Sequence, residues 1–297
     1  MQKIGICLPV IAGVMWGSVG IFVRKFSDYG MDGVAILESK MAAAALIFIA
    51  VIFIYNNKWL CIRAKDIWMF ILTGLAGMMM LNICYNEAAI RLTLSFAAVL
   101  LSLSPVFVMF MAALVFKEKI TRRKAGCTFI ALIGCILVSG AVDNHNSINM
   151  TSSGVAIGLM AAFFYALYSI LSNAIMKRGY NVFTITCYSS LVVTLTLIPV
   201  TDWDVILDFA VEAPVENISL ILMHAVITAV LPYTLYTVSF AYIDTGKASI
   251  LAAGGEPSAA MVFGFIFFAE RLTLLSVIGL IITIGALIVI SKPEKER

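Results

Sequence analysis

One acidic residue stands in an apolar stretch near the end of the chain. Glu256 follows two glycines and precedes a proline, in the run Gly254-Gly255-Glu256-Pro257. An ionised carboxylate at the centre of a bilayer costs at least about 2.5–3.5 kcal/mol, so it should face a partner or a wet cavity. There it could bind a cationic group or exchange a proton for a substrate. The alternative is a buried carboxyl group that hydrogen-bonds to a neighbouring helix and holds a bend.

The same run is a poor helix former. Its two glycines have no side chains, and Pro257 cannot donate a hydrogen bond to the carbonyl of Ala253. We therefore predict a broken helix here, with Gly254, Gly255 and Pro257 as a hinge and with free backbone groups for a ligand. Pro105, in an earlier apolar stretch, is interpreted as a second hinge.

Aromatic side chains recur at positions that could face the same pocket. Tyr165 and Tyr168 share one face of a helix, as do Tyr233 and Tyr236, because residues three apart are neighbours. Rings beside a carboxylate suit an amino group or organic cation through cation–π contact. Simple packing is the alternative for each ring. The candidate substrate-binding residues are Glu256, Trp16, Tyr85, Tyr165, Tyr168, Tyr233, Tyr236 and Glu38.

Three further polar residues fall inside apolar stretches. Glu38 is either an interfacial residue or part of the outer mouth of a pocket. Lys40 lies two positions later, on nearly the opposite helix face, and is interpreted as reaching the outer membrane interface. His224 could relay protons, so His224 and Glu256 are the candidates for proton coupling. A lone interfacial histidine is the alternative for His224.

Composition indicates the elements that must position these residues. The chain is 62% apolar and 12% charged with a mean hydropathy of +1.03, whereas soluble domains average roughly 45–50% apolar and 25% charged. A span needs about 20 apolar residues. We predict an all-α membrane protein with ten transmembrane helices, at about 4–22, 34–55, 67–86, 93–115, 125–141, 154–175, 182–200, 218–240, 247–268 and 274–291.

The distribution of basic residues predicts the orientation. If the N-terminus is cytoplasmic, fifteen Lys and Arg residues fall in the inner segments and four in the outer ones. Cytoplasmic loops carry the excess of these residues. Both termini are therefore predicted to be cytoplasmic, in a multi-pass protein of the plasma or inner membrane.

Part of the sequence occurs twice. Residues 85–121 align without a gap on residues 237–273, so that Pro105 falls on Pro257 and Glu118 on Glu270. Thr121 and Thr273 follow these acids as predicted N-caps, and Glu118 and Glu270 are interpreted as boundary residues or gate contacts. Two halves of five spans, 1–146 and 147–297, must have opposite orientations, and inverted repeats are typical of secondary transporters.

These motifs resemble a known family. Trp16-Gly17, Ala89…Thr93 leading to Pro105, Glu118-Lys119-Ile120-Thr121, and Glu256-Pro257 leading to Glu270…Thr273 resemble the EamA family of the drug/metabolite transporter superfamily. The resemblance covers the whole chain and implies ten spans, cytoplasmic termini and export of amino acids or other small metabolites. Lys40 stands where the family commonly has Arg. A lysine ammonium cannot form the two parallel hydrogen bonds to a carboxylate that an arginine guanidinium forms.

We therefore predict a secondary transporter, and an exporter, of amino acids or organic amines by alternating access through a cavity between the halves. Proton-coupled uptake and a non-transporting receptor or structural protein are the alternatives. No catalytic triad, phosphate-binding loop or metal-ligand cluster is present in the sequence, so we predict neither an enzyme, nor a cofactor, nor a metal site. Basic residues are dispersed, so no nucleic-acid partner is expected.

Glycines at 126, 134, 279 and 285 predict a close helix seam, either within the molecule or in a homodimer.

Overall fold

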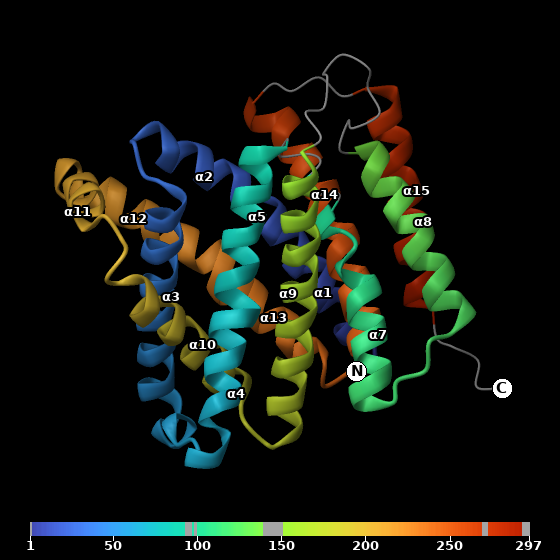
Figure 1. The fold of residues 1–297 in the computed structure, drawn as a ribbon, viewed down its shortest axis with the longest axis horizontal. Helices are drawn as coiled ribbons and strands as arrows, with labels where there is room; N and C mark the ends of the chain where they lie inside the picture. Colours follow the sequence, from blue (N-terminus) through green and yellow to red (C-terminus); the bar gives the residue numbers. More distant parts are fainter. Residues whose placement is uncertain (1, 93–96, 98–99, 139–150, 269–272, 293–297) are drawn as a thin grey trace.

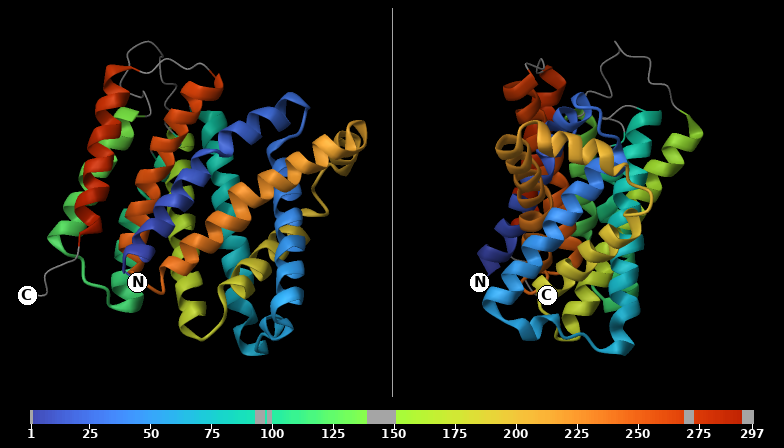
Figure 2. Two further views of the ribbon diagram at one scale, coloured as in Figure 1. Left: turned by 180° about the vertical axis from the view of Figure 1, so that it is seen from behind. Right: turned by 90° about the vertical axis from the view of Figure 1, so that its left-hand side faces the viewer.

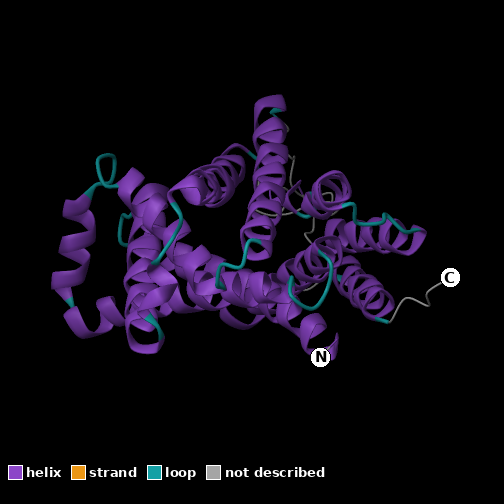
Figure 3. Ribbon diagram, turned by 90° about the horizontal axis from the view of Figure 1, so that it is seen from below, coloured by secondary structure: helices purple, strands orange, loops and turns teal. Residues whose placement is uncertain are grey.

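The computed structural model describes residues 2–92, 97, 100–138, 151–268 and 273–292. Every regular element within these ranges is a helix, and no strand is found there (Figure 3). The predicted all-α fold is confirmed for this part of the chain.

The helices of the first half include two short 3₁₀ turns and one π-helical segment. They are α1 (Gln2–Gly17), α2 (Val19–Asp28), α3 (Gly33–Tyr55), η1 (Asn57–Leu60), η2 (Ala64–Asp66), α4 (Ile67–Leu72), η3 (Thr73–Met79), α5 (Met80–Arg91), α7 (Ser104–Phe116) and α8 (Arg122–Val138). Pro105 lies in the first turn of α7, where its missing N–H has no helical partner in any case.

The second half has its own π-helical segment. Its helices are α9 (Ser152–Lys177), α10 (Val182–Leu197), α11 (Trp203–Glu212), α12 (Pro214–Ala225), η4 (Val226–Val230), α13 (Leu231–Ser239), α14 (Thr245–Phe268) and α15 (Leu274–Ser291). The two π segments, η3 and η4, occupy corresponding positions when the sequence is shifted by the repeat length. Because π-helical turns are rare, their recurrence is structural evidence of the duplication.

Several helices are long and apolar enough to cross a bilayer. In the described residues six runs meet this criterion: Ile4–Asp28, Gly33–Tyr55, Ala64–Ala88, Ser152–Lys177, Pro214–Ser239 and Thr245–Phe267. Shorter apolar helices are Ser104–Phe116, Val182–Leu197 and Leu274–Ile290. Large apolar side chains such as Leu114 and Phe129 are exposed on the outside of the bundle. Such a surface is suited to lipid, and the chain is a multi-pass membrane protein.

Two helices, α8 and α15, begin at the predicted N-caps Thr121 and Thr273. The Thr121 hydroxyl accepts a hydrogen bond from the Lys124 amide at 3.2 Å, at the start of α8. The Thr273 hydroxyl accepts one from the Ser276 amide at 3.2 Å, at the start of α15, within a reciprocal capping box. Both predicted N-caps are therefore confirmed.

Two close helix pairs organise the bundle, α1 with α14 and α8 with α15 (Figure 1). On α8, a Cβ at Gly134 would lie 2.2 Å from the Thr283 hydroxyl and 2.9 Å from the Gly279 carbonyl of α15. Of the four glycines predicted to form a seam, Gly134 and Gly279 therefore meet within the molecule, whereas a Cβ at Gly126 or Gly285 would have no neighbour within 4 Å. The beginning of α1 and the end of α15 lie at the same end of the bundle, here called the terminal end (Figure 2).

Candidate functional site

Five of the predicted aromatic residues form one buried cluster between α1, α9 and α13. Trp16 lies at its centre, with ring centroids 6.0 Å from Tyr165, 5.3 Å from Tyr233 and 5.5 Å from Tyr236. Tyr168 is 5.0 Å from Tyr233, and most of these contacts are edge-to-face, the geometry that aromatic quadrupoles favour. We call these five residues the aromatic cluster.

Hydrogen bonds between helices fix two of the rings. The hydroxyls of Tyr168 and Thr237 are 3.1 Å apart, and those of Ser169 and Tyr236 are 2.9 Å apart. The Ser169 hydroxyl also lies 3.0 Å from the Tyr165 carbonyl of its own helix. The Tyr168–Thr237 and Ser169–Tyr236 hydrogen bonds each join α9 to α13, so they fix the positions of Tyr168 and Tyr236 in the absence of a ligand.

Glu256 lies beside this cluster on α14. Its carboxylate is within electrostatic range of Tyr165 and Tyr233, and also of Tyr85 on α5. The side chain is partly exposed, and within the described residues it forms no hydrogen bond or ion pair. The structure therefore places Glu256 within electrostatic range of three predicted aromatic residues, Tyr85, Tyr165 and Tyr233.

The predicted break in the helix that carries Glu256 is wrong. The helix α14 is continuous from Thr245 to Phe268 and contains Pro257. Pro257 has no N–H to donate to the Ala253 carbonyl. The Cys135 thiol of α8 lies 3.9 Å from this carbonyl and donates a weak hydrogen bond to it. Packing on both sides keeps the segment helical.

Gly254 and Gly255 allow this packing. A Cβ at Gly255 would lie 3.0 Å from the Val10 carbonyl of α1, and a Cβ at Gly254 would lie 2.6 Å from Leu287 of α15. The two glycines thus permit close approach of α1 and α15 to α14. Their predicted hinge role, with that of Pro105 and Pro257, stays a prediction.

Lys40 does not reach the membrane interface, contrary to the interpretation of its sequence position. The side chain is buried, with 6% of its area exposed, and its Nζ donates to Asn82 Oδ1 at 3.3 Å. Asn82 also donates from Nδ2 to the Met78 carbonyl at 2.7 Å, and its side chain lies near Tyr233. Asn82 is not among the predicted site residues, although an amide within an apolar stretch is a signal that could have identified it.

Glu38 and His224 do not belong to the aromatic cluster, although His224 is within electrostatic range of Lys40. Glu38 is fully buried on α3, and neither carboxyl oxygen has a hydrogen-bond partner in the described part of the chain. The His224 ring stacks on Phe22 at 5.0 Å and contacts Phe26 at 5.2 Å, and both of its nitrogens lack partners there. His224 is thus enclosed by aromatic rings of α2, outside the aromatic cluster.

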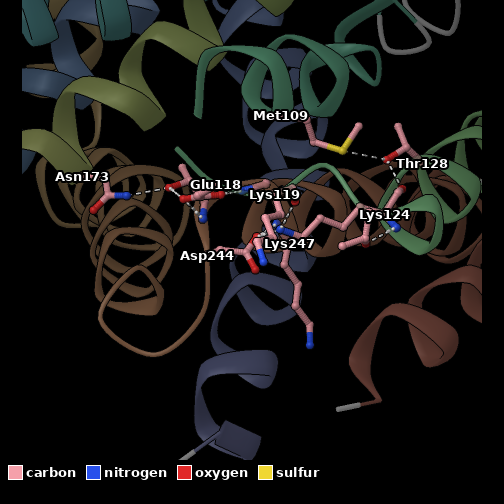
Figure 4. A network of polar contacts seen from close by, with 11 residues as sticks. Met109, Glu118, Lys119, Lys124, Thr128, Asn173, Asp244 and Lys247 are labelled. Carbon is pink, nitrogen blue, oxygen red and sulfur yellow. Dashed lines mark hydrogen bonds and ion pairs between the residues drawn. The ribbon is translucent and has the colours of Figure 1, made fainter. Parts of the chain in front are cut away.

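A second polar site joins the two halves at the terminal end of the bundle (Figure 4). Glu118, in the segment between α7 and α8, accepts hydrogen bonds from the Thr245 amide at 3.1 Å and the Thr245 hydroxyl at 2.9 Å. Its other oxygen accepts from the Gly246 amide at 3.3 Å. A carboxylate of the first half thereby caps the N-terminus of α14 in the second half, where the helix dipole favours an anion.

Neighbouring residues extend this contact, which we call the Glu118 network. Asn173 Nδ2 of α9 donates to the Thr245 hydroxyl at 2.6 Å. Lys124 Nζ of α8 forms an ion pair with Asp244 at 2.9 Å, and Asp244 accepts from the Lys247 amide at 2.8 Å. The spacing of Glu118 and Thr121 indicated a boundary, but no local signal pointed to Asn173 or Asp244 as partners. Glu270, the repeat counterpart of Glu118, lies outside the described residues.

A bundle of long apolar helices with internal duplication defines a multi-pass membrane protein. The sequence model of the EamA-like transporter family matches the chain twice, over residues 3–140 and 152–292. The chain therefore belongs to the EamA-like transporter family, and the resemblance drawn from its motifs is confirmed.

Several relatives are similar over almost their full length. The pseudopaline exporter CntI of Pseudomonas aeruginosa is 24% identical, over 99% of this chain and 98% of that protein. A protein of Streptantibioticus cattleyicolor named "Probable terminal-alkyne amino-acid exporter" is 24% identical, over 95% of this chain and 92% of its own. A solved crystal structure with 11% identity covers 97% of this chain with a TM-score of 0.79 and shows the same fold.

Proposed function

We propose that this protein exports small metabolites bearing an amino group, such as amino acids or organic amines. The observation that carries the proposal is the position of Glu256, an acid without a partner in the described residues, beside a cluster of ordered aromatic rings. A carboxylate attracts an ammonium group, and tyrosine and tryptophan rings add cation–π attraction. The names of two relatives, which are exporters of pseudopaline and of an amino acid, support the same class of cargo.

The proposed architecture is ten spans in two inverted halves, 1–146 and 147–297, with both termini in the cytoplasm of a plasma-membrane protein. The excess of Lys and Arg in the predicted inner segments supports this orientation. It makes the terminal end of the bundle cytoplasmic. The site lies between α1, α9, α13 and α14, which come from both halves, as expected for transporters built from inverted repeats.

Alternating access then requires that the cytoplasmic end opens and closes. The Glu118 network joins a loop of the first half to the start of α14, so it is the contact that must separate for opening towards the cytoplasm. We propose Glu118 as the inner gate, with Pro105, Gly254, Gly255 and Pro257 as the places where the helices flex.

Flux in proteoliposomes tests the proposal. Radiolabelled amino acids and amines are loaded, and efflux is compared between wild type and Glu256→Gln, with and without a pH gradient. We expect the wild-type protein to show efflux, and we expect Glu256→Gln to reduce the rate of efflux at least tenfold. Accumulation driven by an inward proton gradient would instead support proton-coupled uptake, which the unpaired acid Glu256 favours as the second candidate. Absence of flux for every compound would support a receptor or structural role.

A further inference from the structure

A pocket of about 470 Å³ lies between the two halves of the chain at the terminal end of the bundle. It forms where the segment that joins α3 to α4 meets the turn that joins α9 to α10 (Figures 1 and 2). Three of its lining side chains are basic, those of Lys58, Arg63 and Arg178, and no acidic side chain lines it in the described part of the chain. We call it the basic pocket. It shares no residue with the aromatic cluster or the Glu118 network.

Contacts between the two segments hold the walls of the basic pocket in place. The Thr184 hydroxyl donates to the Trp59 carbonyl at 2.7 Å, and the Arg63 amide donates to the Tyr180 hydroxyl at 3.1 Å. The rings of Trp59 and Phe183 stack with centroids 5.6 Å apart and planes within 9° of parallel. Each contact joins the first half to the second, so the space between the walls is preformed.

Arg178 is positioned by a buried acid that does not line the pocket. Its guanidinium forms an ion pair with Asp66, whose side chain is only 1% exposed, and Asp66 also accepts from the Tyr180 hydroxyl at 2.7 Å. A guanidinium has five N–H donors in one plane, and only Nη1 contacts Asp66. The other nitrogens have no partner among the described residues. Arg178 is thus fixed in orientation and still has donors for an anion.

The charges of Lys58 and Arg63 are not neutralised by the protein. Both side chains are exposed, and neither forms an ion pair within the described ranges. Asp66 offsets Arg178 alone, so the pocket retains an excess of positive charge. Basic residues at the cytoplasmic side also orient a membrane protein. Orientation depends on their number, however, and does not require that they line one preformed pocket.

We propose that the basic pocket binds a phosphate group. A phosphate offers several acceptor oxygens, so it can receive charge-assisted hydrogen bonds from Lys58, Arg63 and Arg178 together. The planar fork of an arginine matches two phosphate oxygens at once, and a lysine adds a point charge. The proposal concerns a site apart from the one proposed for export.

A phospholipid and a soluble phosphate compound both carry such a group, and the surroundings of the pocket favour the lipid. Helices α3 and α4 end and begin within four residues of its lining side chains. Both helices expose apolar side chains there, with Ile54 78% and Trp68 54% exposed, which suits acyl chains. In the proposed orientation the pocket faces the cytoplasmic leaflet, whose anionic lipids attract clusters of basic residues.

Native mass spectrometry of the purified full-length protein in detergent tests the proposal. The probes are dioleoyl phosphatidylglycerol, which is anionic, dioleoyl phosphatidylcholine, whose headgroup also carries a positive charge, and glycerophosphate as the soluble compound. Wild type is compared with Lys58→Gln, Arg63→Gln and the double variant, and melting temperatures without ligand check that each is folded. Lys65→Gln is the matched control, because Lys65 is exposed in the same segment but does not line the pocket.

We expect wild type to bind phosphatidylglycerol more tightly than phosphatidylcholine. Each charge removed from the pocket should weaken this binding about fivefold, and the double variant about twenty-five-fold, whereas Lys65→Gln should stay within about twofold of wild type. Glu256→Gln should bind the lipid as wild type does, because Glu256 is not part of the pocket.

Glycerophosphate that binds more tightly than phosphatidylglycerol, with the same losses in the variants, would support the site with a soluble phosphate compound as its ligand. The proposal would be overturned if wild type bound no glycerophosphate and did not distinguish the two lipids. Unchanged affinity in the double variant, or an equal loss in Lys65→Gln and Lys58→Gln, would also overturn it, because binding would then depend on overall charge and not on the pocket.

Discussion

The Glu118 network provides the sharpest prediction about how the two halves move. Glu118→Gln keeps one neutral acceptor for Thr245 but loses the negative charge and the second carboxylate oxygen that serves the Gly246 amide. The NH2 group of glutamine that replaces this oxygen is a hydrogen-bond donor, and it would face the Gly246 N–H, which is also a donor. The substitution should therefore weaken the closed state of the terminal end without altering the aromatic cluster.

The magnitude follows from the contacts that are lost. A hydrogen bond to a charged group contributes about 1.5–3 kcal/mol, and an anion at a helix N-terminus contributes about 0.3–1 kcal/mol. The Glu118 side chain is only partly buried, so solvent screening reduces both values. We expect a net loss of about 1.5–2 kcal/mol, which shifts the equilibrium towards opening of this end by roughly tenfold to thirtyfold.

Distances between spin labels can measure this shift. Labels at Lys119, in the loop that carries Glu118, and at Tyr242, just before α14, report on separation of the two segments. Both positions are exposed, and the exposed native thiols Cys7 and Cys61 are replaced first. The long-distance population should grow in Glu118→Gln relative to wild type.

Glu87→Gln is the matched control. Glu87 forms an exposed ion pair with Arg91 at 2.7 Å, and exposed pairs contribute little. It should leave the distances and the transport rate unchanged. A Glu118→Gln protein that melts at a lower temperature but keeps wild-type distances and flux would refute the gate and leave Glu118 as a helix cap only.

Three further substitutions test the site and the seam. Glu256→Gln should reduce substrate binding at least tenfold with little change in melting temperature, and unchanged binding in a titration would show that the acid has a structural role. Trp16→Ala removes the central ring of the aromatic cluster and should cost about 3–5 kcal/mol; chemical unfolding would check this value, and a loss below about 1 kcal/mol would mean that the cluster packs loosely. Gly134→Ala should cost about 1–3 kcal/mol because its methyl group would meet the Thr283 hydroxyl at 2.2 Å. Gly126→Ala, which meets no atom within 4 Å, is its control and should be neutral or slightly stabilising; equal effects at both glycines would contradict the seam.

Features with local causes could be predicted from the sequence. The apolar composition predicted a membrane protein. The sequence repeat predicted corresponding elements in both halves, because duplicated sequence forms duplicated structure. The N-caps at Thr121 and Thr273 depend on atoms within three residues of each threonine. The tyrosine pairs on α9 and α13 share faces because helical spacing fixes neighbours three residues apart.

Features that depend on distant partners could not be predicted. Pro257 and its glycines are unfavourable to a helix when considered alone, yet α1, α15 and Cys135 pack around them and keep α14 continuous. Lys40 has the length to reach the membrane surface, but Asn82 of α5 lies 3.3 Å from its ammonium in the interior. In each case a contact from another helix reverses the local preference.

The sequence by itself therefore determined the class of protein, its duplication and the residue types that could bind a charged substrate. Only the tertiary structure decided which of them meet: Trp16 with the tyrosines of α9 and α13, and Glu118 with the start of α14, 127 residues further along the chain. The physical reason is that composition, periodicity and caps act over a few residues. The pairing of charges and rings depends instead on how whole helices cross, which no local pattern records.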